Sequence, residues 1–400
     1  MADARIRDAF LAVARDRERA GLLVAYLLLF VVVDAYGQLL PLYYRELGVS
    51  VAALGVAKSV GNGVEAVASG PVGVLADETD RAAIAVVAGG ALAVVLAAFP
   101  FAGGALALGA LVVAFAAARL VFNTAATPLL SASFETGAEG VGWAVRDTAI
   151  YVGGALGVAG TGLLVARLGY GSAFLALVPA LVALVAVLAV AHRPTFGGAV
   201  SLPSLSRPRP LAAVRAVSKP GVLARFLAVK LFAGLGMGSC FYLLPVRAVD
   251  LGVAAGTFLL AFGAAKVVAV AFTLLGGLAT DRVSRKALYV GNFAIEAVML
   301  AALALADSPA LLFVAVGLYV LQTTFEPAVL AFFFDQFDEE ESGRAWGISG
   351  VVARGTGVVA PAVGGYLYRV SPSLAFGLGA AAMVAATAAA LTLPGDPARA

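Results

Sequence analysis

The chain is a succession of long apolar runs separated by short polar turns. Each run holds about 20 or more residues rich in Ala, Val, Leu and Gly, which is enough for an α-helix to cross a bilayer. Solid apolar runs favour helices, because the strands of membrane barrels alternate apolar and polar residues instead. The sequence therefore predicts twelve transmembrane helices, at residues 21–44, 51–76, 82–101, 104–130, 141–167, 171–191, 222–248, 253–280, 286–306, 309–334, 344–368 and 373–393.

The composition agrees with an all-α integral membrane protein surrounded by the lipid bilayer. Hydrophobic residues make up 62% of the chain and charged residues 13%, whereas a soluble domain is about half apolar and a quarter charged. The single cysteine, Cys240, and the single histidine, His192, exclude an internal disulfide and a His/Cys metal site. Because no catalytic constellation or nucleotide-binding loop is present, we expect neither an enzyme nor a cofactor, and no nucleic-acid partner.

The longest connection divides the predicted helices six and six. We expect an N-terminal half at residues 1–191, a Pro- and Arg-rich linker at 192–221 and a C-terminal half at 222–400. One set of loops, together with both termini, holds seventeen Lys and Arg residues and the other set holds four. The positive-inside rule therefore predicts that both termini and the linker are cytoplasmic, in a multi-pass protein of the plasma membrane.

A charged turn occurs twice in the chain. Gly73, Asp77 and Arg81 recur 204 residues later, and the segments 39–41 and 47–49 recur at the same offset. The second copy of the charged turn consists of Gly277, Asp281 and Arg285. Two parallel six-helix halves with a site between them are a plan of transporters.

In this duplicated turn and this layout the chain resembles the major facilitator superfamily over essentially its whole length. The resemblance implies two pseudo-symmetric six-helix bundles that work by alternating access, and it resolves no subfamily. It also implies that the two copies of the turn form a conformational latch between the halves. The alternative is a solvated turn that only sets topology. One chain holds both halves, so we expect a monomer.

Ionisable side chains inside a bilayer are costly, so they usually face a cavity and pair. The resemblance implies that helices one, four, seven and ten line the cavity, and these carry Asp34, Arg119, Lys230 and Glu326. We hypothesise that Asp34 binds the coupled proton and that Arg119 sets its affinity; the alternative is a permanent structural ion pair. Asn123 belongs to the same short motif as Arg119.

A second set of polar side chains supports an alternative ligand. It consists of Lys58, Glu65, Lys266 and Arg354. Lys58 and Lys266 could converge on an anion, although local pairing is the alternative for each. A glycine-rich stretch, 153–162, lies inside an apolar run, so it predicts close helix packing rather than a phosphate loop.

These observations favour secondary transport of a small-molecule substrate, most specifically proton-coupled export of a small amphipathic or organic molecule. The first alternative is an importer or exchanger of an organic anion that uses Lys58, Lys266, Arg119 and Lys230. A more remote alternative is a membrane receptor that does not transport.

Overall fold

The computed structural model describes residues 16–133, 139–195, 218–280 and 283–396, and within these residues the regular structure is entirely helical. The chain divides into two compact units. Unit 1 consists of residues 1–43, 64–205 and 259–264, and unit 2 consists of residues 44–63, 206–258 and 265–400. The first part of the second predicted helix is thus grouped with unit 2, and a short piece of the eighth is grouped with unit 1.

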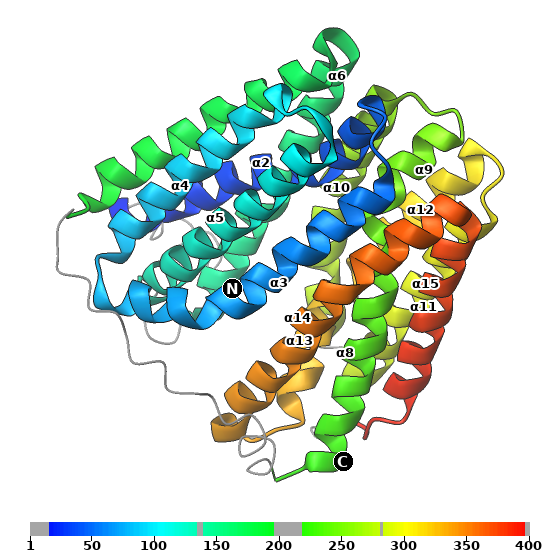
Figure 1. The fold of residues 1–400 in the computed structure, drawn as a ribbon. Helices are drawn as coiled ribbons and strands as arrows, with labels where there is room; N and C mark the ends of the chain where they lie inside the picture. The colour runs from blue at the N-terminus through cyan, green and yellow to red at the C-terminus, as the bar shows by residue number, and fades with distance from the viewer. Residues whose placement is uncertain (1–15, 134–138, 196–217, 281–282, 397–400) are drawn as a thin grey trace. The chain divides into compact units, whose positions relative to one another are not determined.

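The helices form two groups, and within each group they follow one another with short connections (Figure 1). The first group is α2 (Arg17–Glu46), α3 (Val51–Glu78), α4 (Arg81–Ala98), η1 (Phe99–Phe101), α5 (Gly104–Ala132) and α6 (Glu139–His192). The second group is α8 (Pro220–Cys240), η2 (Phe241–Leu243), α9 (Leu244–Asp250), α10 (Ala255–Thr280), α11 (Arg285–Leu305), α12 (Pro309–Gln322), α13 (Glu326–Asp335), α14 (Glu339–Val370) and α15 (Pro372–Leu391).

These helices account for the predicted membrane crossings. Among the described residues, eight helices are long and apolar enough to cross a membrane, and nine if the bent pair α12–α13 is counted as one. One of the eight is α6, which breaks at Gly169, where φ is 79°, and therefore supplies predicted helices five and six. The remaining two, α3 and α14, coincide with predicted helices two and eleven. The predicted all-α membrane fold is confirmed.

The two copies of the internal repeat also share a backbone conformation. Gly48 and Gly252 both have positive φ, at 69° and 83°, a conformation that favours glycine because it has no Cβ. In both turns the next residue closes the same loop: the N–H of Val49 donates to Tyr44 O at 2.8 Å and that of Val253 donates to Ala248 O at 3.0 Å. Both turns are Schellman motifs, in which a glycine with positive φ ends the helix.

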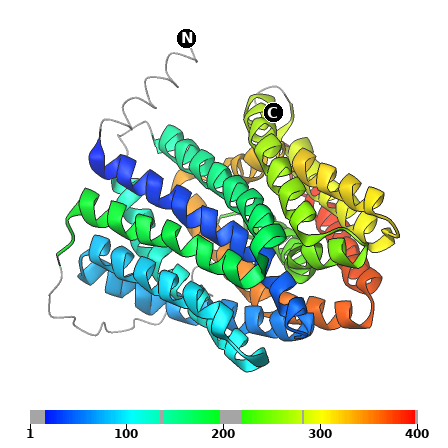
Figure 2. The same ribbon diagram turned by 90° about the horizontal axis from the view of Figure 1, so that it is seen from above.

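In unit 1, α2 lies between the two arms of α6 (Figure 2). On the first arm, a Cβ at Gly153 or Gly157 would overlap the backbone carbonyls of Leu27 and Val31. On the second arm, Ala191 packs against Gly21 of α2. Glycines let two helix backbones approach closely, which replaces the hydrophobic driving force that lipid does not provide.

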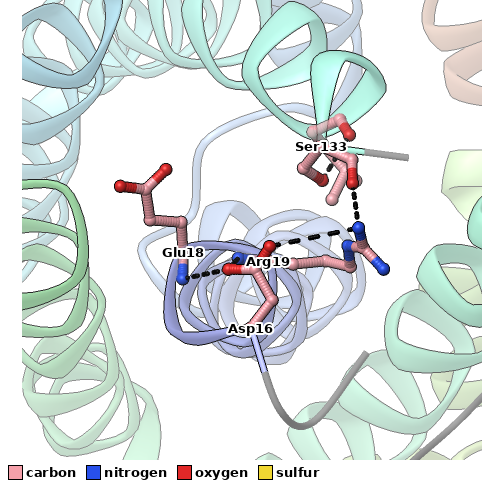
Figure 3. Close-up of polar contacts among 5 residues, drawn as sticks. Asp16, Glu18, Arg19 and Ser133 are labelled. Atoms are coloured by element: carbon pink, nitrogen blue, oxygen red, sulfur yellow. Dashed lines mark hydrogen bonds and ion pairs between the residues drawn. The ribbon is translucent and has the colours of Figure 1, made fainter. Parts of the chain in front are cut away.

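The first turn of α2 is fixed to the end of α5 (Figure 3). Asp16 caps α2, since its Oδ1 accepts from the backbone N–H groups of Glu18 at 2.9 Å and Arg19 at 3.3 Å. The guanidinium of Arg19 donates to the carbonyl of Ser133, which is the C-cap residue of α5. A cation at a helix C-terminus satisfies carbonyls that have no partner within the helix.

In unit 2, a proline in α14 is compensated by a neighbouring helix. Pro361 has no N–H, so the carbonyl of Gly357 loses its partner within the helix. Asn62 of α3 supplies the missing donor, with Nδ2 at 2.6 Å from Gly357 O. Tyr242 of η2 donates its hydroxyl to the carbonyl of Pro361 at 2.8 Å. The irregular backbone of α14 is therefore held by side chains from two other elements.

The α2–α6 contact gives a stability prediction. Alanine inside a helix is more favourable than glycine by about 1 kcal/mol of helix propensity. At position 157, however, the alanine Cβ would overlap the carbonyl of Val31. We expect Gly157→Ala to destabilise the protein by ~1–3 kcal/mol, as overpacking typically does. At about 2–4 °C per kcal/mol, purified protein in detergent should melt a few degrees lower. Gly160→Ala, where no atom lies within 4 Å of the added Cβ, should not lower the melting temperature, and equal losses in both variants would contradict this packing.

Candidate functional site

Asp34 lies on α2 at its contact with α6. A Cβ at Gly154 would overlap the Asp34 carboxylate, so Gly154 provides the space that this carboxylate occupies. The Asp34 side chain is only partly exposed. A carboxyl group is thus inserted in a tight helix contact, between the close approaches at Gly153 and Gly157.

The carboxylate that Arg119 contacts is that of Glu65. Arg119 Nη2 of α5 lies 2.8 Å from Glu65 Oε1 of α3, and the two side chains are 35% and 22% exposed. The structural alternative raised from the sequence paired Arg119 with Asp34. The structure pairs Arg119 and Glu65 across predicted helices four and two instead. Asn123, one turn along α5 from Arg119, is partly buried.

A second polar group in unit 1 surrounds Arg146 of α6. Its guanidinium carbon lies 5.7 Å from the ring centroid of Tyr26 and 4.8 Å from that of Trp143, and it donates to Asp147 at 2.7 Å. Tyr26 of α2 also shares a hydrogen bond of 2.9 Å with Thr127 of α5. Cation–π contacts of this kind hold a charge against apolar helices.

In unit 2, Lys230 and Glu326 belong to one cluster with Glu296 and Trp346. The ammonium of Lys230 on α8 lies 5.2 Å from the ring centroid of Trp346 on α14. Both Lys230 and Glu326 lie within coulombic range of the Glu296 carboxylate on α11. The Glu296 side chain is buried, with 8% of the residue exposed.

Two buried amides complete this cluster. Gln322, the last residue of α12, donates through Nε2 to Asn292 Oδ1 at 2.8 Å, and Asn292 Nδ2 lies 3.4 Å from Glu296 Oε1. Neither amide was predicted from the sequence, because most of the predicted site residues were identified by their charge. The sequence does contain a pattern that indicates Asn292. Asn292 and Glu296 are four residues apart in an apolar run, so they share a helical face.

The structure also describes the other predicted polar residues. Lys58 of α3 lies 5.5 Å from the ring centroid of Tyr242, within unit 2. Lys266 of α10 is buried, with 8% of the residue exposed, and Arg354 of α14 is exposed. Near Lys58, Ser59 Oγ accepts the backbone N–H of Ala362 at 3.0 Å. Ser59, like Asn62, could have been found from Pro361, because a proline inside a membrane helix requires outside hydrogen-bonding groups.

The first copy of the duplicated turn forms a local ion pair. Arg81 Nη2 lies 2.5 Å from Asp77 Oδ1, and the Asp77 side chain is 67% exposed. No atom of unit 1 comes within 4 Å of a Cβ built at Gly73. Within this unit Gly73 therefore has open space around its Cα rather than a close helix contact. The proposed latch between the halves stays a prediction.

The second copy is described only in part. Gly277 lies in α10, whereas Asp281 falls outside the described residues. Arg285, at the start of α11, lies 2.6 Å from Asp335 Oδ2 at the end of α13. The two arginines of the repeat therefore have different partners, one within its own turn and one on another helix.

Both ends of the predicted linker are held by carboxylates. Asp80 Oδ2 accepts from Thr195 N at 2.7 Å and Thr195 Oγ1 at 2.8 Å, while Glu341 accepts from the backbone N–H and the hydroxyl of Ser218. Burial alone would raise the pKa of Asp80, but hydrogen bonds from Thr195 and from two backbone N–H groups of α4 outweigh burial and hold that pKa below its usual value. The anion therefore stabilises this junction at neutral pH, and its contribution is lost only as pH falls through the lowered pKa.

The comparisons with known proteins agree with this architecture. The family model described as Major Facilitator Superfamily matches residues 22–278 and 243–400. No curated protein matches the sequence. A variant of the nucleoside transporter NupG has a TM-score of 0.75 at 13% identity, covering 94% of this chain and 99% of its own.

Two other solved structures share the fold. A bacterial homologue of the human lysosomal transporter Spinster, inward-facing and unoccupied, has a TM-score of 0.65 at 15% identity, with 94% of this chain and 93% of that chain covered. A transporter of the POT family in complex with a thioalcohol-conjugated peptide has a TM-score of 0.68 at 11% identity, with 92% and 94% covered. The chain therefore belongs to the Major Facilitator Superfamily, and it is a membrane transporter rather than an enzyme.

Proposed function

We propose that the protein is a secondary transporter that exports a small amphipathic organic molecule in exchange for protons. Asp34 carries the coupled proton in this proposal. The observation that supports it most is the position of the Asp34 carboxylate, which is inserted in the contact between α2 and the first arm of α6 at Gly154.

This position supports a coupling role because the contact leaves little room for adjustment. On either side of Asp34, glycines bring the α6 backbone against carbonyls of α2. Adding or removing a proton changes both the charge and the hydrogen-bonding capacity of a carboxyl group. In a site with restricted access to water, that change alters the free energy of the helix contact. Occupancy by a proton can therefore bias the arrangement of the two helices.

The Arg119–Glu65 pair supports separate roles for Arg119 and Asp34. Since the Arg119 guanidinium contacts the Glu65 carboxylate at 2.8 Å, its charge is already compensated within the unit. We propose that this pair positions α3 against α5 and influences Asp34 only through the local field. Arg119 then acts as a positioning residue rather than as the direct partner of the proton site.

The substrate class is proposed from pairs of polar and aromatic side chains within each unit and from the related folds. Aromatic rings accompany several of the polar groups, as with Lys58 over Tyr242, Lys230 over Trp346 and Arg146 over Tyr26. Such pairs suit molecules that have both apolar and polar parts. The structural neighbours include a nucleoside transporter and a transporter solved with a peptide conjugate, so nucleosides and short peptides are the first probes to test.

The coupling proposal predicts the behaviour of Asp34→Asn in proteoliposomes. A proton gradient is imposed, and the internal pH is followed while candidate compounds are added in turn. We expect at least one compound to produce a proton flux in the wild-type protein. We expect Asp34→Asn to abolish that flux, because the amide cannot bind and release a proton.

Asp16→Asn is the matched control, because Asp16 lies on the same helix but acts as its cap, and asparagine caps helices equally well. This variant should retain the proton flux. A flux that persists in Asp34→Asn would refute the assignment of Asp34. Uptake of a labelled organic anion that is independent of the proton gradient would support the alternative exchanger, and saturable binding without any translocation would support a receptor.

We also propose that the protein resides in the plasma membrane with both termini in the cytoplasm. The chain offers a direct labelling test, because its single cysteine, Cys240, is buried. In intact cells, an impermeant maleimide should label Asp307→Cys in the α11–α12 connection. Glu78→Cys, at the end of α3, should react only after permeabilisation. The reverse pattern of labelling would overturn the proposed orientation.

A further inference from the structure

The segment that follows α15, residues 392–396, caps the first turn of α11. Asp396 Oδ2 accepts the backbone N–H of Arg285 at 3.1 Å, and Asp396 Oδ1 accepts that of Lys286 at 2.8 Å. The first N–H groups of a helix have no partner within the helix, and the helix dipole favours an anion beside them. Asp396 supplies that anion from a position 111 residues further along the chain than Arg285.

Side chains from three helices of unit 2 bind this segment and the end of α15 in return. Lys286 of α11 donates through Nζ to the carbonyls of Leu391, at 3.0 Å, and of Leu393. At the end of a helix the carbonyls have no helical partner, and a cation is favoured there. The other two contacts are Arg225 Nη1 of α8 to Thr392 O at 2.7 Å and Gln336 Nε2, at the C-cap of α13, to Gly395 O at 3.3 Å. One short segment therefore joins the end of α15 to α8, α11 and α13.

Unit 1 contains the equivalent junction, with the carboxylate on the opposite side. There Asp80, the N-cap residue of α4, accepts two hydrogen bonds from Thr195, which follows α6. The residue 204 positions after Asp80 is Ser284, the N-cap of α11, and the carboxylate comes from Asp396 after α15. In both units a carboxylate thus joins the start of the third predicted helix to the segment after the sixth. The two copies of the repeat keep this connection although they make it with different residues.

The connection in unit 2 also fixes the arginine of the second charged turn. Arg285, whose backbone N–H is accepted by Asp396, is the first residue of α11. Its guanidinium lies 2.6 Å from Asp335 Oδ2 at the end of α13. Because the arginine side chain projects from the backbone that the cap holds in place, Asp396 determines the position from which Arg285 reaches Asp335.

We propose that Asp396 is a positioning residue, which keeps Arg285 paired with Asp335 while unit 2 moves in the transport cycle. The segment 392–396 then holds α8, α11, α13 and α15 together at one end, so that these helices move as one body. Alternating access consists largely of rigid-body movements of helix groups. Loss of this connection therefore slows the movement without altering the contacts of the substrate. The inference goes beyond the proposed function, because it involves neither Asp34 nor the coupled ion.

Hydrogen–deuterium exchange of the purified full-length protein tests the positioning directly and needs no substrate. We expect Asp396→Ala to speed amide exchange in the first turn of α11 about fivefold, the factor that corresponds to a typical lost helix cap. Exchange in the last turn of α13 should rise as well, because Arg285 is no longer held on Asp335.

Two further variants separate the cap from a general loss of structure. Asp396→Asn keeps one of the two accepting oxygens and should give a smaller increase in exchange than Asp396→Ala. Asp338→Ala is the matched control, because Asp338 begins α14 but its side chain makes no capping bond within the described part of the chain. This variant should leave both turns unchanged.

Transport by the same variants is measured in proteoliposomes with labelled nucleosides and short peptides as probes. For a probe that the wild-type protein moves, Asp396→Ala should lower the maximal rate and leave the KM unchanged. Unchanged exchange at the end of α13 in monodisperse Asp396→Ala would overturn the positioning role, as would an unchanged maximal rate. The exchange result is obtained without any probe, so it decides this inference separately from the proposed function, which the Asp34→Asn flux experiment decides.

Discussion

The structure depends on one constraint: hydrocarbon provides no solvent for charges, so every ionisable group that a membrane helix carries must be compensated by the protein. The described residues meet this constraint in different ways. Arg119 is paired with Glu65, and Arg146 is held between two aromatic rings and Asp147.

The same absence of water governs how the helices pack. Backbone groups that a proline or a break leaves without partners are satisfied by side chains, as Asn62 does for the carbonyl of Gly357 and Thr323 does at the end of α12. Where there is no such need, glycines allow backbone-to-backbone contact, as between α2 and α6. The carboxylate of Asp34 lies within one of these close contacts. A local change in protonation is therefore placed where it can alter helix packing.

Much of this architecture could be predicted from the sequence. Apolar runs of sufficient length predicted the helices, because crossing a bilayer imposes a minimum length. The 204-residue repeat predicted equivalent turns, and Gly48 and Gly252 share a backbone conformation that is unfavourable for other residues. Asp34, Arg119, Lys230 and Glu326 were identified because charges are rare inside membranes and because the family resemblance implies that their helices line the cavity.

The pairing of these residues could not be predicted. Which charge meets which depends on the rotation and depth of each helix, and small differences in either decide whether Arg119 reaches Asp34 or Glu65. Neutral residues such as Asn292, Gln322 and Asn62 were overlooked for a different reason. Their role appears only once a broken helix, a proline or a buried carboxylate is placed beside them. The positions of the charges were thus a property of the sequence, whereas their partners are a property of the fold.

The central claim is that the Asp34 carboxylate exchanges protons as the substrate crosses the membrane. It is tested most directly by the reversal potential in proteoliposomes, where known substrate and proton gradients are opposed until net flux stops. Coupling through Asp34 predicts that the substrate distribution at zero net flux shifts with the proton gradient that is imposed. A substrate distribution that does not respond to the proton gradient would contradict the account.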